Sequence, residues 1–233
     1  MKKTLGIIGG MGPMATADLY KKIVSFTEAS SDNEHIHVII DSNVNIPDRT
    51  AAILRGGADP LPELTKSARL LERAGANILM MPCNTAHFFY DAVCAATELP
   101  VLHMLRLTAE AIKRQGVNKV GLLATDGTIQ TGIYARLFSD NGIAYMEPAE
   151  AEQRAVMDAI YKGVKAGVRN YDSSKLRAAL DAMRSRGAEA FVLGCTELPI
   201  AFEDYRLDHP TIDPTSVLAR AAVAAAGYRV KEK

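Results

Sequence analysis

The sequence predicts an α/β fold built from two similar halves, and two kinds of observation lead to this prediction. Short apolar runs alternate with longer stretches in which apolar residues recur at helical spacing. This alternation is typical of βαβ units, in which parallel strands are covered by helices. The second observation is an internal repeat, which divides the chain into two copies of one pattern.

The repeat is defined by glycines at fixed distances from two cysteines. Gly75 and Gly187 each stand eight residues before a cysteine, Cys83 in the first copy and Cys195 in the second. In both copies the glycine closes a helical stretch, and an apolar strand leads to the cysteine. The first glycine of each copy, Gly6 in one and Gly121 in the other, precedes the same cysteine by 77 and 74 residues respectively. Nearly equal spacings indicate a duplicated unit.

The predicted strands follow the apolar runs from the N-terminus to the C-terminus. They are residues 4–8, 35–42, 76–81, 101–102, 119–124, 144–146, 190–193 and 209–212. The clearest helical patterns between or after them span residues 15–30, 62–73, 87–96, 174–186 and 216–226. The last of these is apolar, and we expect it to pack back on the first half.

The domain boundaries follow from the repeat. Residues 1–100 together with 208–233 are expected to form a first α/β domain that carries Cys83, and residues 101–207 a second domain that carries Cys195. Both should contain parallel, Rossmann-like sheets. We expect a pseudo-two-fold axis to relate the two half-domains, with the active site in the cleft between them.

Composition excludes several classes of function. The 233 residues contain 27 basic and 27 acidic side chains, and 6% are aromatic with no Trp, so nothing favours nucleic-acid binding. No apolar run approaches the ~20 residues of a transmembrane helix. The N-terminus imitates a secretory signal, but its glycines and Pro13 suit a strand and turn better. Three scattered cysteines indicate reduced thiols and a cytoplasmic protein.

Cys83 and Cys195 are the candidate catalytic residues. Each follows a strand and precedes a helix start, the place where open α/β sheets bind ligands. Asn84, Thr85 and Thr196 follow these cysteines and can bind a small polar ligand. A helix N-terminus is expected to lower the pKa of both thiols. Cys94 lies in an apolar helical stretch and is interpreted as a core residue.

A reaction that inverts a carbon centre explains why two thiols are needed. One group must remove the α-proton from one face, and another must deliver a proton to the opposite face. Equivalent groups from two related halves meet this need, with one cysteine as thiolate and the other as thiol. Backbone amides, Asn84, Thr85 and Thr196 can stabilise the charge that develops. The sequence therefore predicts a racemase.

A carboxylate-bearing substrate also needs a cationic residue. Arg49 lies in the loop after the second predicted strand, and a guanidinium binds a carboxylate through two parallel hydrogen bonds. Lys165, within the segment Tyr161-Lys162-Gly163-Val164-Lys165, is by itself better interpreted as an exposed helix lysine. Arg49 is therefore the stronger candidate from the residues alone.

The chain resembles the aspartate/glutamate racemase family over essentially its whole length, and specifically the aspartate racemase branch. The matching motifs are Gly6-Ile7-Ile8-Gly9-Gly10-Met11-Gly12-Pro13, Pro47-Asp48-Arg49-Thr50, Pro82-Cys83-Asn84-Thr85-Ala86-His87 and Gly194-Cys195-Thr196-Glu197-Leu198-Pro199. The resemblance implies racemisation without pyridoxal phosphate, metal or any other cofactor, and usually a homodimer. It implies that Cys83 acts on the D enantiomer and Cys195 on the L enantiomer.

The same resemblance extends the site beyond the cysteines. It implies that Arg49 and Lys165 bind the substrate carboxylates, and that the site is lined by Met11, Asp48, Asn84, Thr85, Thr128 and Thr196. Two positions depart from glutamate racemases, which resemble this chain less. Those carry Asp-Ser where this chain has Gly10-Met11-Gly12, and His where it has Glu197. The expected substrate is therefore aspartate, with glutamate as a second candidate.

Several alternatives remain open at this stage. Gly10-Met11-Gly12-Pro13-Met14-Ala15 fits a dinucleotide-binding loop, but the usual acidic partner about 20 residues on is missing. Cys83 and His87 are four residues apart, so in a helix both side chains would lie on one face, as a cysteine hydrolase would need. His35 and His37 alternate on a predicted strand, yet no third metal ligand stands nearby.

Two further alternatives concern the class of protein. Maleate isomerases and hydantoin racemases are built on a similar paired-cysteine architecture. A non-catalytic protein that binds acidic amino acids is the alternative outside enzymes, and it would leave the α-hydrogen of aspartate unexchanged.

Overall fold

The computed structural model describes residues 2–232 and separates them into two compact α/β units. The first unit contains the described residues up to Met104 and those from Thr215 onward. The second unit is Leu105–Pro214. Each unit contains one four-stranded sheet, so each has its own core and can be described by itself.

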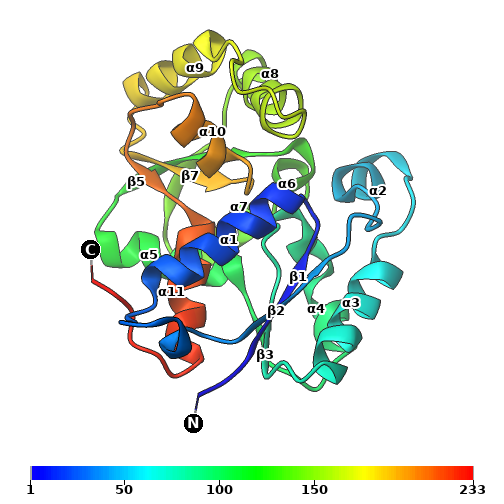
Figure 1. Cartoon of the computed structure of the whole chain (residues 1–233). Helices are drawn as coiled ribbons and strands as arrows, with labels where there is room; N and C mark the ends of the chain where they lie inside the picture. Colours follow the sequence, from blue (N-terminus) through cyan, green and yellow to red (C-terminus); the bar gives the residue numbers. More distant parts are fainter. Residues whose placement is uncertain (1, 233) are drawn as a thin grey trace. The chain divides into compact units, whose positions relative to one another are not determined.

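The sheet of the first unit has the strand order β2-β1-β3-β4, and all its strands are parallel. The strands are β1 (Leu5–Gly9), β2 (Val38–Ser42), β3 (Ile78–Met80) and β4 (Val101–Leu102), of which the first three are labelled in Figure 1. β1 and β3 are completely buried, as expected for strands covered on both faces. Leu5 pairs with Val38 on one side and with Ile78 on the other.

Helices of the first unit connect and cover this sheet. They are α1 (Pro13–Phe26), the 3₁₀ turn η1 (Asp32–Glu34), α2 (Arg49–Arg55), α3 (Leu61–Arg73), the 3₁₀ segment η2 (Thr85–Phe89), α4 (Tyr90–Cys94) and α11 (Pro214–Ala225), which begins one residue before the unit. α3 shows the principle: Leu64, Ala68 and Leu71 lie one turn apart and are buried, while the opposite face is charged.

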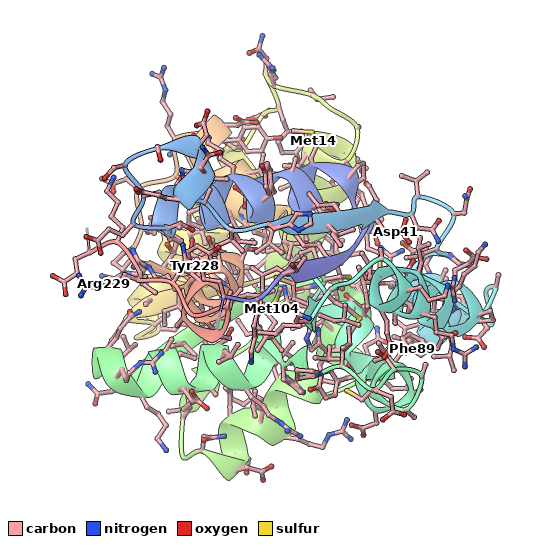
Figure 2. The ribbon with its side chains drawn as sticks, turned by 60° about the horizontal axis from the view of Figure 1, so that its bottom comes forward. Met14, Asp41, Phe89, Met104, Tyr228 and Arg229 are labelled. Carbon is pink, nitrogen blue, oxygen red and sulfur yellow. The ribbon has the colours of Figure 1, made fainter. Side chains whose placement is uncertain are left out.

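The C-terminal segment closes the amino-terminal end of the first sheet. The Lys3 amide donates to the carbonyl of Ala226, and Thr27 and Val230 form an antiparallel bridge. Figure 2 shows Tyr228 and Arg229 at the end of this unit opposite Asp41, which lies in the last part of β2. The carboxyl-terminal end of the sheet therefore stays separate from this closure.

The second unit repeats the topology of the first. Its strand order is β6-β5-β7-β8, again all parallel, with β5 (Lys119–Ala124), β6 (Ala144–Met146), β7 (Ala190–Gly194) and β8 (Thr211–Ile212). Its helices are α5 (Met104–Gln115), α6 (Asp126–Gln130), α7 (Ile133–Asp140), α8 (Glu150–Asp158), the π-helical segment η3 (Ala159–Val164), α9 (Ser174–Ser185) and α10 (Leu198–Asp204). The predicted fold class, two similar α/β halves with parallel sheets, is confirmed.

The repeated glycines have a common structural reason. Gly75 follows α3 and Gly187 follows α9, and both have φ = +95°. This backbone conformation is open to glycine and ends a helix sharply. In both units it turns the chain directly into the strand that leads to a cysteine.

Some predicted elements are shorter than expected. β2 begins at Val38, so His35 and His37 precede the strand instead of alternating along it. The stretch predicted as one helix from residue 87 to 96 is a 3₁₀ segment followed by a short α-helix that ends at Cys94. Among residues 2–232, no helix has the length and apolar character needed to cross a membrane.

Candidate active site

Each cysteine lies at the point of its sheet where the order of successive strands reverses. In each unit the chain moves outward from the first strand to an edge, then returns to pair on the first strand's other side. Loops at this switch point diverge, and the crevice they leave at the carboxyl ends of the strands is where open α/β sheets bind ligands. Cys83 follows β3 and Cys195 follows β7, the equivalent strands of the two sheets.

Cys83 is held in a tight turn after β3. Its amide donates to the carbonyl of Met81 at 2.9 Å. Its side chain is 6% exposed and packs in a cluster with Met11, which follows β1, and Ile46, which follows β2. The residue therefore lies among the carboxyl ends of three neighbouring strands.

His87 fixes the backbone of Cys83. Its Nδ1 donates to the carbonyl oxygen of Cys83 at 2.9 Å, and its Nε2 accepts from the amide of Met104 at 3.1 Å. Burial and the nearby His103 lower the pKa of His87 to about 3, so the ring is neutral at physiological pH. Because both ring nitrogens bind backbone groups, His87 is not placed to activate the thiol. The arrangement argues against the cysteine hydrolase alternative.

Arg49 is buried near the same loops. Asp48 caps α2 by accepting from the amide of Ala51 at 2.7 Å, which places Arg49 in the first turn. The Arg49 guanidinium donates to the carbonyls of Pro47 at 2.9 Å, Ile46 at 3.2 Å and Met11 at 3.4 Å. α2 also packs against η2, the segment after Cys83. The loops after β1 and β2 thus hold a fixed cation in the unit of Cys83.

The other predicted residues of this unit lie in the same region. Asn84 and Thr85 are buried, and the Asn84 carbonyl accepts from the amide of His87 at 3.0 Å. Cys94 is half-buried and packs against the cluster that contains Cys83, in agreement with a packing role.

In the glycine-rich loop after β1, the Gly10 amide is already bound within the protein and is not available to a dinucleotide. The Gly10 amide donates to Oγ1 of Thr16 at 2.9 Å, and that hydroxyl donates to the carbonyl of Gly12 at 3.0 Å. Pro13 begins α1 and contributes no amide hydrogen. These contacts argue against the dinucleotide-binding alternative.

Cys195 has an acidic neighbour. Its side chain is 7% exposed, and Sγ lies 3.0 Å from Oε2 of Glu197, in the geometry of an S–H donor. Burial raises the pKa of the Cys195 thiol well above its usual value, Glu197 raises it further, and Lys165 opposes both. The expectation that a helix start lowers this pKa is wrong for Cys195, because desolvation and a carboxylate outweigh a helix of one to two turns.

Lys165 reaches this pair from the π-helical segment. The segment packs against α10, and the Lys165 amide donates to the carbonyl of Ile160, five residues back. The Nζ lies 3.9 Å from Oε1 of Glu197 and 4.8 Å from the centre of the Tyr161 ring. Lys165 is an exposed residue, as expected, but its side chain is only 24% exposed because it extends toward Glu197 and the Tyr161 ring.

Helix α6, which follows β5, carries the remaining predicted residue, Thr128. Thr128 is fully buried, and its amide donates to Oγ1 of Thr125, which caps α6. The Gln153 amide group donates to the carbonyl of Ala124 at 3.0 Å and to Asp126 at 2.8 Å. Thr196, next to Cys195, is also buried.

Two features of the site were not assigned from the sequence. Glu197 was noted as a departure from glutamate racemases, but its contact with Cys195 was not predicted, although a spacing of two residues allows it. Thr125 was also not predicted. For metals, residues 2–232 contain no group of three or more His, Cys, Asp or Glu side chains placed to hold an ion.

Comparison with known proteins identifies the family. The family model described as Asp/Glu/Hydantoin racemase matches residues 8–222. The chain belongs to this family. It is therefore a racemase, in agreement with the resemblance seen in the sequence motifs.

Individual relatives match over nearly the whole chain. The broad specificity amino-acid racemase RacX of Bacillus subtilis is 25% identical, over 94% of this chain and 96% of its own length. Among solved structures, the aspartate racemase of Picrophilus torridus is 32% identical with a TM-score of 0.85, covering 98% of this chain and 96% of that one. An aspartate racemase homologue from Pyrococcus horikoshii is 27% identical with a TM-score of 0.76, covering 97% and 99%.

Proposed function

We propose that this racemase interconverts the enantiomers of an acidic amino acid, with aspartate as its main substrate. The observation that carries the proposal is the equivalence of Cys83 and Cys195, which follow corresponding strands of two repeated sheets. A duplicated unit that keeps the same acid/base residue in both copies suits a reaction that needs one such group on each face of a carbon.

In the proposed mechanism the two cysteines are the catalytic residues. One, as thiolate, removes the α-hydrogen, and the other, as thiol, delivers a hydrogen to the opposite face. Following the family resemblance, Cys83 acts on the D enantiomer and Cys195 on the L enantiomer. Each transfer leaves the pair with its protonation exchanged, ready for the mirror-image substrate. No cofactor takes part.

The substrate assignment rests on the cations of the two units. An acidic amino acid carries two carboxylates, and Arg49 and Lys165 are the residues proposed to bind them. Arg49 is held by carbonyls of the loops around Cys83, and Lys165 lies beside the acidic neighbour of Cys195. Met11, Asp48, Asn84, Thr85, Thr128 and Thr196 are proposed to complete the site.

The similarity to the aspartate racemase of Picrophilus torridus supports aspartate over glutamate. The family resemblance also supports a homodimer, which sedimentation velocity of the purified protein can test. Side-chain length is a weak discriminator, because one methylene changes binding by only about 1–3 kcal/mol. Glutamate is therefore the second substrate to measure.

The experiment is a substrate panel. The purified protein is dialysed against EDTA and incubated separately with L- and D-aspartate, L- and D-glutamate, a neutral amino acid, a hydantoin and maleate, followed by chiral chromatography. The proposal predicts the fastest conversion for aspartate in both directions. Faster conversion of the neutral amino acid, the hydantoin or maleate would overturn the substrate assignment.

A further inference from the structure

Glu197 contacts two charged or ionisable partners with its two oxygens. Oε2 lies 3.0 Å from Sγ of Cys195, and Oε1 lies 3.9 Å from Nζ of Lys165. The Glu197 residue is only 3% exposed, so the carboxylate is held inside the protein next to the thiol. Burying a carboxylate without partners costs free energy. The thiol hydrogen and the ammonium group offset this cost for Glu197.

The position of Glu197 addresses a specific difficulty at Cys195. The thiol is 7% exposed, and its burial together with the charge of Glu197 favours the protonated form over the opposing effect of Lys165. To act as a base, however, the sulfur must first lose that proton, and exchange with bulk water is hindered at a buried atom. A neighbouring acceptor at hydrogen-bond distance removes the need for solvent.

We propose that Glu197 is a positioning residue that holds the Cys195 proton whenever Cys195 acts as the base. This inference rests on the proposed two-cysteine mechanism and adds a third group to one half of it. In Cys83's unit the ring beside the cysteine, His87, binds backbone groups with both nitrogens and is not placed to do the same. The two cysteines therefore differ in how they lose their protons.

The step is balanced as an internal proton transfer. The S–H bond of Cys195 breaks and an O–H bond forms at Glu197, so the negative charge moves from the carboxylate to the sulfur with no change in total charge. The thiolate then takes the α-hydrogen of the substrate, and Cys83 gives its hydrogen to the opposite face. Lys165 lies beside the carboxylate oxygen that does not contact the sulfur and stabilises the pair while it carries one negative charge.

The test isolates proton removal from each enantiomer. Racemisation cannot do this, because its equilibrium constant of one forces equal kcat/KM in both directions. We therefore use L- and D-3-chloroaspartate. Removal of the α-hydrogen to sulfur is followed by breaking of the C–Cl bond, loss of chloride and formation of an enamine, which water hydrolyses to oxaloacetate and ammonium. Chloride release then reports only the base that acts on that enantiomer.

Four variants are compared with the wild type. Cys83→Ala and Cys195→Ala identify which enantiomer depends on which cysteine. Glu197→Gln keeps the size of the side chain but cannot accept the proton. Glu203→Gln, at an exposed glutamate of α10, the helix that Glu197 precedes, is the matched control.

The pH profile separates proton holding from a merely structural effect. For the enantiomer that depends on Cys195, we compare the rate of chloride release in Glu197→Gln with that in the wild type. We expect this ratio to be well below one at pH 6 and to increase about tenfold per pH unit, because the thiol of the variant must lose its proton to solvent. For the mirror enantiomer and for Glu203→Gln, we expect a ratio near one at every pH.

A ratio that is independent of pH, or an equal loss for both enantiomers, would overturn the role of Glu197 and leave the two-cysteine mechanism intact. If the two cysteine variants do not divide the enantiomers between them, the two-cysteine mechanism itself fails. Should Glu197→Gln not fold, Glu197→Asp retains a carboxylate, and the proposal predicts a pH-independent loss confined to the Cys195 enantiomer. A loss shared by both enantiomers, or one that varies with pH, would contradict it.

Discussion

His87 and Cys83 are joined through the cysteine's backbone: the imidazole Nδ1 donates to the Cys83 carbonyl oxygen at 2.9 Å. The other ring nitrogen accepts from the Met104 amide, so one buried, neutral histidine connects the Cys83 turn to the backbone of Met104 in the same unit. This contact makes a residue with no proposed chemical step a determinant of where the Cys83 turn lies.

The first prediction concerns stability and pH. The pKa of His87 is about 3 in the folded chain, below the usual 6.5, so between these values the unfolded chain binds the proton and the folded chain does not. The stability that His87 contributes is therefore complete above pH 6.5 and is lost as pH falls toward 3, by about 1.4 kcal/mol per pH unit.

Urea denaturation at pH 7.5 and 5.5 measures this loss. His87→Gln should reduce the free energy of unfolding by about 1–3 kcal/mol at pH 7.5, through weakened backbone hydrogen bonds. It should also remove the histidine's share of the pH dependence, whereas His37→Gln, at an exposed histidine, should keep it. An identical pH dependence in wild type and His87→Gln would show that His87 is not buried in its neutral form.

The second prediction concerns Arg49. Arg49→Lys keeps the positive charge but loses the planar guanidinium, which donates to the loop carbonyls and is proposed to bind a substrate carboxylate. We expect KM for aspartate to rise about 10- to 100-fold, equivalent to about 1.4–2.7 kcal/mol of lost binding. Steady-state kinetics in both directions checks this, with Arg55→Lys, at the exposed end of α2, as the control. An unaltered KM would refute the role of Arg49 in binding.

The third prediction concerns Lys165 and the reactivity of Cys195. Lys165 lowers the pKa of the Cys195 thiol against the effects of burial and Glu197. Lys165→Met should therefore raise this pKa further and slow alkylation of Cys195 by iodoacetamide at pH 8, by about tenfold for each unit of increase. Mass spectrometry of the modified peptide measures the rate. Lys162→Met, at an exposed lysine paired with Asp158, should have no effect, and an unchanged rate in Lys165→Met would contradict the contact.

The sequence predicted the architecture because local and long-range signals agree. Buried parallel strands require continuous apolar runs, and the sharp turn into each cysteine-bearing strand requires a glycine such as Gly75 or Gly187, so both features are visible without coordinates. Element ends were less predictable. The segment around His87 begins as a 3₁₀ turn because the amide of His87 bonds to the carbonyl of Asn84, three residues back, and no composition signal marks this.

Only those site residues that lie in a recognisable sequence motif or directly after a predicted strand could be predicted. Cys83, Cys195 and Arg49 stand out because each follows a strand, and Thr128 and Lys165 were proposed only through the family resemblance. The Glu197–Lys165 contact depends on the π-helical segment that brings residue 165 against α10, a tertiary relationship between residues 32 positions apart. The direction of the Cys195 pKa shift was predicted wrongly, because desolvation cannot be judged from a strand-helix boundary alone.

The central claim is that two cysteines act on opposite faces of one α-carbon, and deuterium incorporation tests it most directly. L- and D-aspartate are incubated separately in deuterium oxide with the wild type and with Cys83→Ala, Cys195→Ala and Cys94→Ala, followed by chiral separation and mass analysis. We predict that the wild type and Cys94→Ala form the opposite enantiomer with one deuterium at the α-carbon, while Cys83→Ala and Cys195→Ala form none. Racemisation that survives in either of these two variants, or is lost in Cys94→Ala alone, would contradict the account.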